Sequence, residues 1–342
     1  MDAVLLVSFG GPESNDDVMP FLRRVTAGRN VPEERLKAVA EHYYVRDGVS
    51  PINGQNRELV AALTEFLAPD GLPVFWGNRN SEPWLAYAFG AMAEAGVTRA
   101  IAVLTSAYSS YSGCRQYREN LADAAAAAPE IEVIKVPAYY NSPGFLEANL
   151  GNLAAVLAQA PPDTHVVFTT HSIPESMAAQ SGPGGGGYTA QHLELARQLM
   201  AGVAERAGHE SAWALVYQSR SGPPHVPWLE PDINDHMEDL AGRGVRSVVV
   251  APIGFVSDHM EVVQDLDTEA ADTAAQLGLE FRRVPTVGVH PAFVSGLADW
   301  VRSVRREEPP ATAFGVPLPA PCVARCCPNP RAERPALCGA EQ

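Results

Sequence analysis

Short apolar runs rich in valine and isoleucine alternate along most of this chain with longer stretches of helical periodicity. This alternation is typical of a parallel sheet that is covered by helices, because each strand is then buried on both faces. The pattern predicts two similar groups of four strands. The first group covers residues 4–9, 74–76, 100–105 and 131–136, and the second covers 165–170, 212–218, 247–253 and 280–284.

The stretches between these strands predict helices at 35–45, 55–67, 83–95, 116–128, 145–159, 189–207 and 260–277, with a closing helix at 292–306. Eight prolines in the last 36 residues prevent regular structure after that helix. We therefore predict an α/β fold with two similar doubly wound parallel-sheet (Rossmann-like) domains. They are expected at 1–149 and 150–291, followed by the closing helix and a tail rich in cysteine and proline at 292–342.

Length and charge limit the classes of function. A chain of 342 residues is long enough for two domains with separate cores. The formal charge of −15 repels phosphate backbones and anionic lipid surfaces, which argues against nucleic-acid binding and membrane docking. Residues 1–9 resemble a first strand rather than an export signal, and no window reaches the ~18 uninterrupted apolar residues of a membrane span. We expect a cytoplasmic protein without an integral membrane segment.

Two glycine-rich segments do not match phosphate-binding motifs. The pair Gly10-Gly11 after the first strand lacks the dinucleotide fingerprint, which argues against a nicotinamide enzyme. Residues 182–187 lack a preceding strand and a P-loop lysine, so we expect a mobile surface loop there.

Five cysteines have an uneven distribution. Cys114 lies within the predicted body, whereas Cys322, Cys326, Cys327 and Cys338 lie in the tail. In a chain without an export signal, such spacing indicates ligands for a soft metal rather than disulfides. The alternative is a disordered tail with free thiols.

His171 and Glu261 follow two predicted strands of the second half, at the edge where ligands bind in doubly wound sheets. An imidazole at this place can accept a proton or bind a metal. The alternative is a histidine that only bonds loop carbonyls. Glu261 also has capping-box spacing from Asp258, with Asp258 as the N-cap.

Glu261 begins a row of acids at helical spacing. Asp265 and Glu269 follow at i+4 and i+8, which would place three carboxylates along one face of a helix. Like charges so spaced destabilise a helix by a few tenths of a kcal/mol per pair, and cations moving along the row would offset this cost. A solvated acidic face is the alternative.

Several motifs together resemble the ferrochelatase family, and in particular the actinobacterial type that inserts iron into coproporphyrin and carries a 2Fe–2S cluster. Two of the motifs are specific, namely Tyr217-Gln218-Ser219-Arg220 with Trp228-Leu229-Glu230-Pro231, and Gly254 to Glu261. The other matching stretches are residues 5–12, 48–52, 108–114 and 171–174.

The resemblance implies a lyase that inserts Fe²⁺ into coproporphyrin III, with an active-site cleft between the two domains. In the family the pair corresponding to His171 and Glu261 removes the pyrrole protons and handles the metal across the flat macrocycle. We expect His171 as the base and Glu261 as metal guide and proton acceptor, since both groups suit these steps. Asp265 and Glu269 match a family line of acids thought to conduct metal inward.

The resemblance also places Arg29, Tyr43, Ser50 and Tyr108 near the ring or its propionates, although each of them can also be an ordinary surface or core residue. The chain departs from relatives at two positions. His42 stands where other bacteria often have an arginine for propionate binding, and Phe9 stands where some relatives have a tyrosine close to the iron. A phenyl ring cannot ligate, which leaves His171 as the main protein ligand for iron.

For the cluster, the resemblance implies one internal ligand and three ligands from the tail. Cys114 matches the internal position, and we assign Cys322, Cys326 and Cys327 from the tail because they are close together. Cys338 is then a spare thiol. A structural zinc bound by four cysteines is the competing metal.

Three other functions remain open at this level. A protoporphyrin IX ferrochelatase differs from the expected enzyme only in its substrate. An iron-binding protein or metallochaperone would use the acids and thiols without acting on a porphyrin. A cobalt or nickel chelatase could use the same groups, because an acid and an imidazole do not strictly select iron. The bacterial members of the family suggest a monomer.

Overall fold

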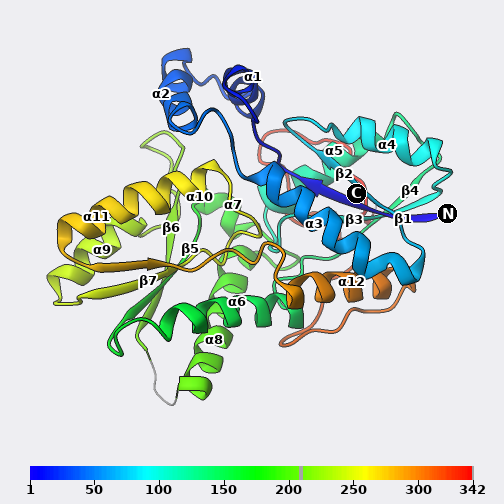
Figure 1. Cartoon of the computed structure of the whole chain (residues 1–342). Helices are drawn as coiled ribbons and strands as arrows, with labels where there is room; N and C mark the ends of the chain where they lie inside the picture. The colour runs from blue at the N-terminus through cyan, green and yellow to red at the C-terminus, as the bar shows by residue number, and fades with distance from the viewer. Residues whose placement is uncertain (208–210, 341–342) are drawn as a thin grey trace.

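The computed structural model describes residues 1–207 and 211–340. Two four-stranded parallel sheets form the body, with strand orders β2-β1-β3-β4 and β6-β5-β7-β8 (Figure 1). The strands are β1 (Asp2–Ser8), β2 (Val74–Asn78), β3 (Arg99–Leu104), β4 (Glu132–Lys135), β5 (His165–His171), β6 (Trp213–Gln218), β7 (Ser247–Ala251) and β8 (Glu280–Arg283). All eight predicted strands are present, and the predicted α/β class is confirmed.

Helices cover both sheets. They are α1 (Asn15–Val25), α2 (Glu33–Tyr44), α3 (Ile52–Leu67), α4 (Leu85–Glu94), α5 (Gln116–Ala125), α6 (Pro143–Leu157), α7 (Glu175–Ala179), α8 (Gly187–Ala207), α9 (Ile233–Gly242), α10 (Met260–Gln264), α11 (Ala271–Leu277) and α12 (Pro291–Arg305). The sequence pattern missed α1, α7 and α9. The predicted helix at 260–277 is interrupted by a π-helical segment, η3 (Asp265–Ala270), and a second π segment, η2 (Tyr111–Arg115), precedes α5.

The strands are buried on both faces, as the apolar runs predict. Along β1, Val4 and Leu6 join one hydrophobic cluster while Leu5 and Val7 join another, because successive side chains point to opposite faces. In β7, Val249 contacts the same first cluster as Val4, so one core extends through both halves. This shared core joins the two sheets into one body.

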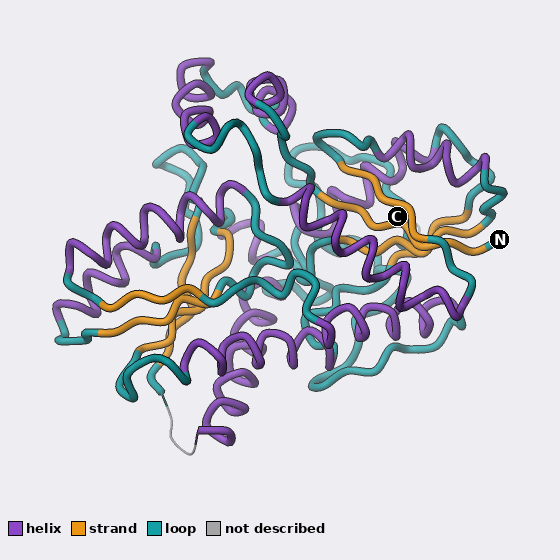
Figure 2. The backbone as a smooth tube through the Cα atoms, viewed as in Figure 1, coloured by secondary structure: helices purple, strands orange, loops and turns teal. Residues whose placement is uncertain are grey.

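The closing helix α12 packs on α6 and α3, beside the first sheet. Close packing requires glycine at the crossing, because a Cβ on Gly144 would lie 2.3 Å from the carbonyl oxygen of Ala292. Within the described part of the tail, 306–340, the backbone forms loops and one isolated bridge (Figure 2). These loops run back along the first half, where Asn141 Nδ2 donates to the carbonyls of Phe314 and Val316 at 3.1 and 3.0 Å.

No helix in residues 1–207 or 211–340 is long and apolar enough to cross a membrane.

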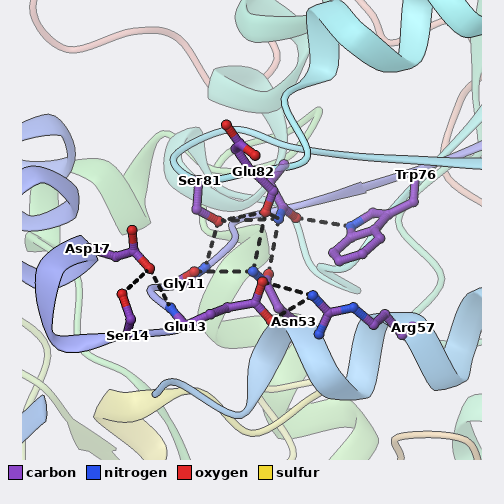
Figure 3. A network of polar contacts seen from close by, with 10 residues as sticks. Gly11, Glu13, Ser14, Asp17, Asn53, Arg57, Trp76, Ser81 and Glu82 are labelled. Atoms are coloured by element: carbon purple, nitrogen blue, oxygen red, sulfur yellow. Dashed lines mark hydrogen bonds and ion pairs between the residues drawn. The ribbon is translucent and has the colours of Figure 1, made fainter. Parts of the chain in front are cut away.

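A polar network fixes the loop that follows β1 (Figure 3). Asn53, at the start of α3, donates from Nδ2 to the carbonyl of Gly11 at 3.1 Å and accepts at Oδ1 from Asn78 at 3.0 Å. Ser81 Oγ accepts from the backbone N–H of Gly11 at 3.0 Å. Asn53 is 1% exposed, so water cannot supply the hydrogen bonds that its partners would lose without it. The network holds the carboxyl edge of the first sheet, where Phe9 lies, in a fixed position.

Replacing Asn53 by alanine is expected to lower the free energy of unfolding by about 2 kcal/mol, because buried partners are left without hydrogen bonds. The urea concentration at the midpoint of unfolding measures this loss, provided that the slope of the free energy against urea concentration is unchanged. Asn152→Ala is the matched control, since Asn152 makes only long bonds of 3.4 and 3.3 Å to the carbonyls of Pro285 and Thr286 near the surface. Equal losses in the two variants would show that the network does not hold this loop.

Candidate active site

His171 and Glu261 are in direct contact. His171 ends β5, Glu261 lies in the first turn of α10 after β7, and these two strands are neighbours in the second sheet. The Nε2 atom of His171 lies 3.4 Å from Oε2 of Glu261. The expectation that the two groups face each other across a macrocycle is therefore wrong for this structure, because both come from the second half and no ring fits between them. They can act together on one face of a ligand.

The surroundings of His171 fix its orientation. Its Nδ1 contacts the carbonyl oxygen of Ser172, an acceptor, so Nδ1 carries a proton and Nε2 holds the lone pair of the neutral ring. The hydroxyl of Tyr188 donates to the carbonyl of His171 at 2.8 Å and lies 2.7 Å from Oγ1 of Thr170. Burial disfavours the imidazolium, but the contact with Glu261 outweighs burial and raises the pKa of His171.

Glu261 is held ionised. Burial opposes its charge, but the contact with His171 and the electrostatic effects of His259 and Arg29 lower the pKa of Glu261 to about 2. The side chains of His171 and Glu261 are nevertheless 30% and 54% exposed, so solvent and a ligand can reach both. The pair thus combines a carboxylate with an imidazole that readily accepts a proton.

The predicted N-cap of this helix is wrong. His259, not Asp258, is the N-cap of α10, with Nδ1 accepting from the backbone N–H of Val262 at 3.3 Å. Asp258 instead accepts two hydrogen bonds from Arg283 on β8, each 3.1 Å long. A charge-assisted bidentate pair is stronger than a cap to a neutral N–H, which explains why the aspartate turns away.

Asp265 and Glu269 continue from Glu261, but not along a regular α-helix. The π segment η3 changes the register, and Gln264 donates to Glu269 at 3.2 Å across five positions. Burial and the charge of Glu261 raise the pKa of Asp265 to about 7, although the hydroxyl of Ser219 donates to this carboxylate. Asp265 therefore changes its charge near neutral pH. The sequence reasoning did not assign a role to Ser219, whose positive φ of 61° marks a constrained position.

Of the four expected substrate residues, Tyr43 and Arg29 lie within the electrostatic reach of Glu261. Tyr43 is 6% exposed in the cluster between α1 and α2, where burial and the charge of Glu261 raise the pKa of its phenol. Ser50 is 3% exposed beside the Gly11 loop. Tyr108 is 3% exposed, and its hydroxyl donates to the carbonyl of Ile253 at 2.7 Å. Arg29 is exposed and interacts electrostatically with Glu261.

The two departures from the family pattern lie on different elements. Phe9 packs partly buried against the cluster of α1 and α2, at the carboxyl edge of the first sheet. His42 lines an open groove between α2 and the π segment, together with Glu41, Val45, Arg46, Gln264 and Thr268. Arg46 donates to Thr268 at 2.9 Å across this groove, a long-range contact that the sequence did not reveal.

The thiols assigned as cluster ligands lie together. Cys114 from η2 and Cys322, Cys326 and Cys327 from the tail form one buried cluster, with Sγ of Cys326 and Cys327 3.8 Å apart. Cys338 lies outside this cluster, and its Sγ donates to the carbonyl of Val133 at 3.1 Å. As the side chains of the described residues stand, no group of three or more His, Cys, Asp or Glu has the geometry to hold a metal ion. The thiols are therefore gathered but are not in ligand geometry.

Positive charge and an N–H donor surround the thiols. Lys135 is 4% exposed, and the charges of the thiols outweigh the effect of burial and raise the pKa of its ammonium. The backbone N–H of Gly182 donates to Sγ of Cys327 at 3.1 Å. Contacts with Cys114 and Cys326 lower the pKa of Cys322. The contacts among the thiols and burial raise the pKa of Cys114 and Cys326, whereas the pKa of Cys327 is lowered, so a thiolate, the form that binds metals, is favoured only at Cys322 and Cys327.

Comparisons with known proteins agree on one family. Residues 1–305 match the family model described as Ferrochelatase. The coproporphyrin III ferrochelatase of Streptomyces coelicolor is 51% identical over 364 residues, covering 99% of this chain and 96% of that protein. The coproporphyrin III ferrochelatase of Propionibacterium freudenreichii is 46% identical over 348 residues, covering 99% of this chain and 97% of that protein.

Solved structures agree on the fold. The structure of SirB from Bacillus subtilis with Fe³⁺ superposes with a TM-score of 0.52 at 12% identity, covering 90% of this chain and 98% of that chain. At this identity the likeness concerns the fold alone, and it confirms the predicted chelatase architecture. The family model and the relatives extend over the sheets that carry His171 and Glu261. The chain belongs to the ferrochelatase family.

Proposed function

We propose that this chain is a lyase of haem biosynthesis that inserts Fe²⁺ into coproporphyrin III and releases both pyrrole N–H protons. The observation that carries the proposal is the contact of His171 with Glu261 at the open edge of the second sheet. Relatives named as coproporphyrin III ferrochelatases, at 51% and 50% identity over 99% of the chain, support the choice of substrate.

The pair supplies what metal insertion needs. The ring must lose its two N–H protons while the cation loses its water ligands. The neutral imidazole of His171 offers the lone pair of Nε2 to a pyrrole proton, and the carboxylate of Glu261, 3.4 Å away, stabilises the imidazolium that forms. The carboxylate of Glu261 also suits Fe²⁺ as a temporary ligand. Because the two groups lie on one half of the molecule, both act from the same face of the ring.

Asp265 and Glu269 are proposed to lead Fe²⁺ towards Glu261. Their carboxylates follow Glu261 along α10 and η3, and the charges of Glu261 and Glu269 both raise the pKa of Asp265. A cation that passes along these acids relieves this repulsion. Protons released from the ring can leave by the same route, since Asp265 changes its charge near pH 7.

For the macrocycle, we propose Arg29 as a partner of a propionate, because it is exposed and close enough to Glu261 for mutual electrostatic stabilisation. Tyr43 and Ser50 are proposed as walls of the site rather than as hydrogen-bonding partners, since both are buried. The hydroxyl of Tyr108 already donates a hydrogen bond to the carbonyl of Ile253. We therefore propose that Tyr108 packs behind the residues that line the site and does not contact the ring.

We further propose that Cys114, Cys322, Cys326 and Cys327 hold a 2Fe–2S cluster. Four buried thiols from body and tail supply the number of thiolate ligands that this group needs, although they would have to move into ligand geometry, and Lys135 compensates part of their charge. A small cavity lined by Cys114, Cys322, Cys326 and Lys135 lies beside them. Bound there, a cluster would provide electron-transfer chemistry and would tie the tail to the body. Zinc fits the same four donors and is the competing metal.

Anaerobic incubation with Fe²⁺ and either coproporphyrin III or protoporphyrin IX tests the proposed reaction by absorbance. We expect the spectrum of an iron porphyrin to develop faster with coproporphyrin III. Faster reaction with protoporphyrin IX would correct the substrate, and reaction only with Co²⁺ or Ni²⁺ would correct the metal. Iron binding without reaction of either porphyrin would indicate a metallochaperone instead. We also propose that the protein is cytoplasmic and monomeric. Sedimentation of the purified protein tests the monomeric state.

A further inference from the structure

Arg283, on β8, binds two aspartates that lie on either side of Glu261 in the chain. Its Nη1 and Nη2 atoms donate to the two carboxylate oxygens of Asp258, each at 3.1 Å. Its Nη2 also donates to Oδ2 of Asp267 at 3.2 Å, and its Nε lies 2.5 Å from Oδ1 of the same residue. All three nitrogens of the guanidinium thus face a carboxylate. Bidentate bonds between charged groups are strong and directional, so they fix the two aspartates relative to β8.

The segment between the two aspartates is not a regular helix. Helix α10 ends after five residues, where the π segment η3 replaces the usual hydrogen-bond pattern. The bond at its N-cap, from the N–H of Val262 to His259, is long at 3.3 Å. Val262 and Leu266 are buried in the core of the second half, but apolar contacts are not directional. The direction in which Glu261 points therefore depends on polar bonds from outside the segment.

Other elements hold the same segment at different points. The backbone N–H of Asp258 donates to Oε1 of Gln55 on α3 at 2.9 Å, which connects the loop before α10 to the first half. Asp265 accepts from Ser219, which follows β6. Asp265 and Asp267 are two positions apart, so their side chains leave nearly opposite sides of the helix. The guanidinium on Asp267 thus holds the segment without occupying the carboxylate of Asp265.

We propose that Arg283 is a positioning residue for iron insertion, an inference that rests on the function proposed above. By binding Asp258 and Asp267, it fixes the backbone on both sides of Glu261. Glu261 then stays within reach of His171, at the observed distance of 3.4 Å between Oε2 and Nε2. Such a constraint matters because a displacement of about 1 Å at a reacting group can cost about 10²-fold in rate.

The test compares iron insertion by the full-length protein with that of Arg283→Ala, Arg283→Lys and Asp267→Ala. We expect Arg283→Ala to lower kcat about 10- to 100-fold and to change KM for coproporphyrin III less than about threefold, because the walls of the ring site stay in place. Lysine keeps the charge but not the fork of donors, so Arg283→Lys should recover only part of the rate. Asp267→Ala removes one of the two bound carboxylates and should lower kcat about three- to tenfold.

Arg282→Ala is the matched control. Arg282 lies on the same strand, pairs with Glu280 near the surface at 2.7 Å, and should keep the full rate when replaced. An equal loss in Arg282→Ala would overturn the inference, because it would show that any change in β8 disturbs the site. An unchanged kcat in Arg283→Ala would overturn it as well.

A double variant separates positioning from general damage. If Arg283 acts through Glu261, adding Arg283→Ala to a protein that already carries Glu261→Gln should lower kcat less than about twofold further. A purely structural role predicts that the two losses multiply. Multiplied losses in the double variant would therefore contradict the positioning role of Arg283.

Hydrogen exchange without porphyrin or iron keeps this inference separate from the proposed reaction. We expect the amides of residues 258–270 to exchange about tenfold faster in Arg283→Ala and in Asp267→Ala, with the protection of β5 and β7 unchanged. If the wild-type protein inserts no iron, the reaction is wrong, and exchange alone decides whether Arg283 holds the segment. Unchanged exchange in both variants would show that it does not. If Arg283→Ala fails to fold, Asp267→Ala, at a partly exposed position, decides both rate and exchange.

Discussion

Glu261→Gln and His171→Ala are each expected to lower kcat about 10²-fold or more, because general acid–base catalysis contributes about this much. Glutamine keeps the size of the Glu261 side chain but cannot accept a proton or carry the charge that Fe²⁺ needs. Alanine at position 171 removes the Nε2 lone pair that lies 3.4 Å from Glu261. Initial rates of iron insertion into coproporphyrin III measure both effects.

The same two variants are expected to fold normally. The side chains are 30% and 54% exposed, and an ion pair open to solvent contributes about 1 kcal/mol or less to stability. Glu238→Gln, an exposed carboxylate on α9, is the matched control and should keep the full rate. Near-normal rates in both His171→Ala and Glu261→Gln would show that another group performs the proton transfer.

Cys114→Ser is expected to abolish the visible absorption bands of an iron–sulfur protein and to lower bound iron to background. The four thiols form one cluster, and a hydroxyl is a poor replacement for a thiolate ligand. Cys338→Ser is the matched control, since its Sγ donates to the carbonyl of Val133 and lies outside that cluster. Metal analysis and absorption spectra of the purified proteins measure the result.

The wild-type spectrum decides between the two metals. Zinc in stoichiometric amount without visible bands would replace the iron–sulfur proposal with a structural zinc site. Bands that persist in Cys114→Ser but disappear in Cys338→Ser would exchange the roles of these two thiols. In either case the tail would still be linked to the body by the hydrogen bonds of Asn141, which do not depend on a metal.

The strands could be predicted because a strand that is buried on both faces appears in the sequence as a short run of apolar residues. The run Val248-Val249-Val250, for example, is apolar throughout, since alternate residues enter different cores. The missed helices lack a comparably clear sequence pattern. Pro20 lies inside α1, where it removes a backbone hydrogen bond and normally argues against a helix. Helix α9 has only ten residues, with Ile233, Met237 and Leu240 buried, which is too short for a clear periodicity.

The proximity of His171 and Glu261 was predictable from the sequence, but the geometry of their contact was not. The positions of His171 and Glu261 after two strands indicate that they meet at one edge, because parallel neighbours end together. Their direct contact depends on side-chain orientation, which no spacing reveals. The role of Asp258 was decided by Arg283, a partner on another strand, and the π segment at Asp265 altered the expected row of acids.

The tail contacts also constrain the order of assembly during synthesis. Arg118, on α5, donates through Nε to the carbonyl of Leu337, 219 positions later, and Cys114 lies four residues before Arg118. A ribosome makes both sheets before it makes the segment that covers α5. The contacts of the tail with Cys114 and Arg118 can thus form only after the second half has been made. A metal held by Cys114 and the tail thiols, as proposed, would bind only after residue 327 has been made, when both sheets are already complete.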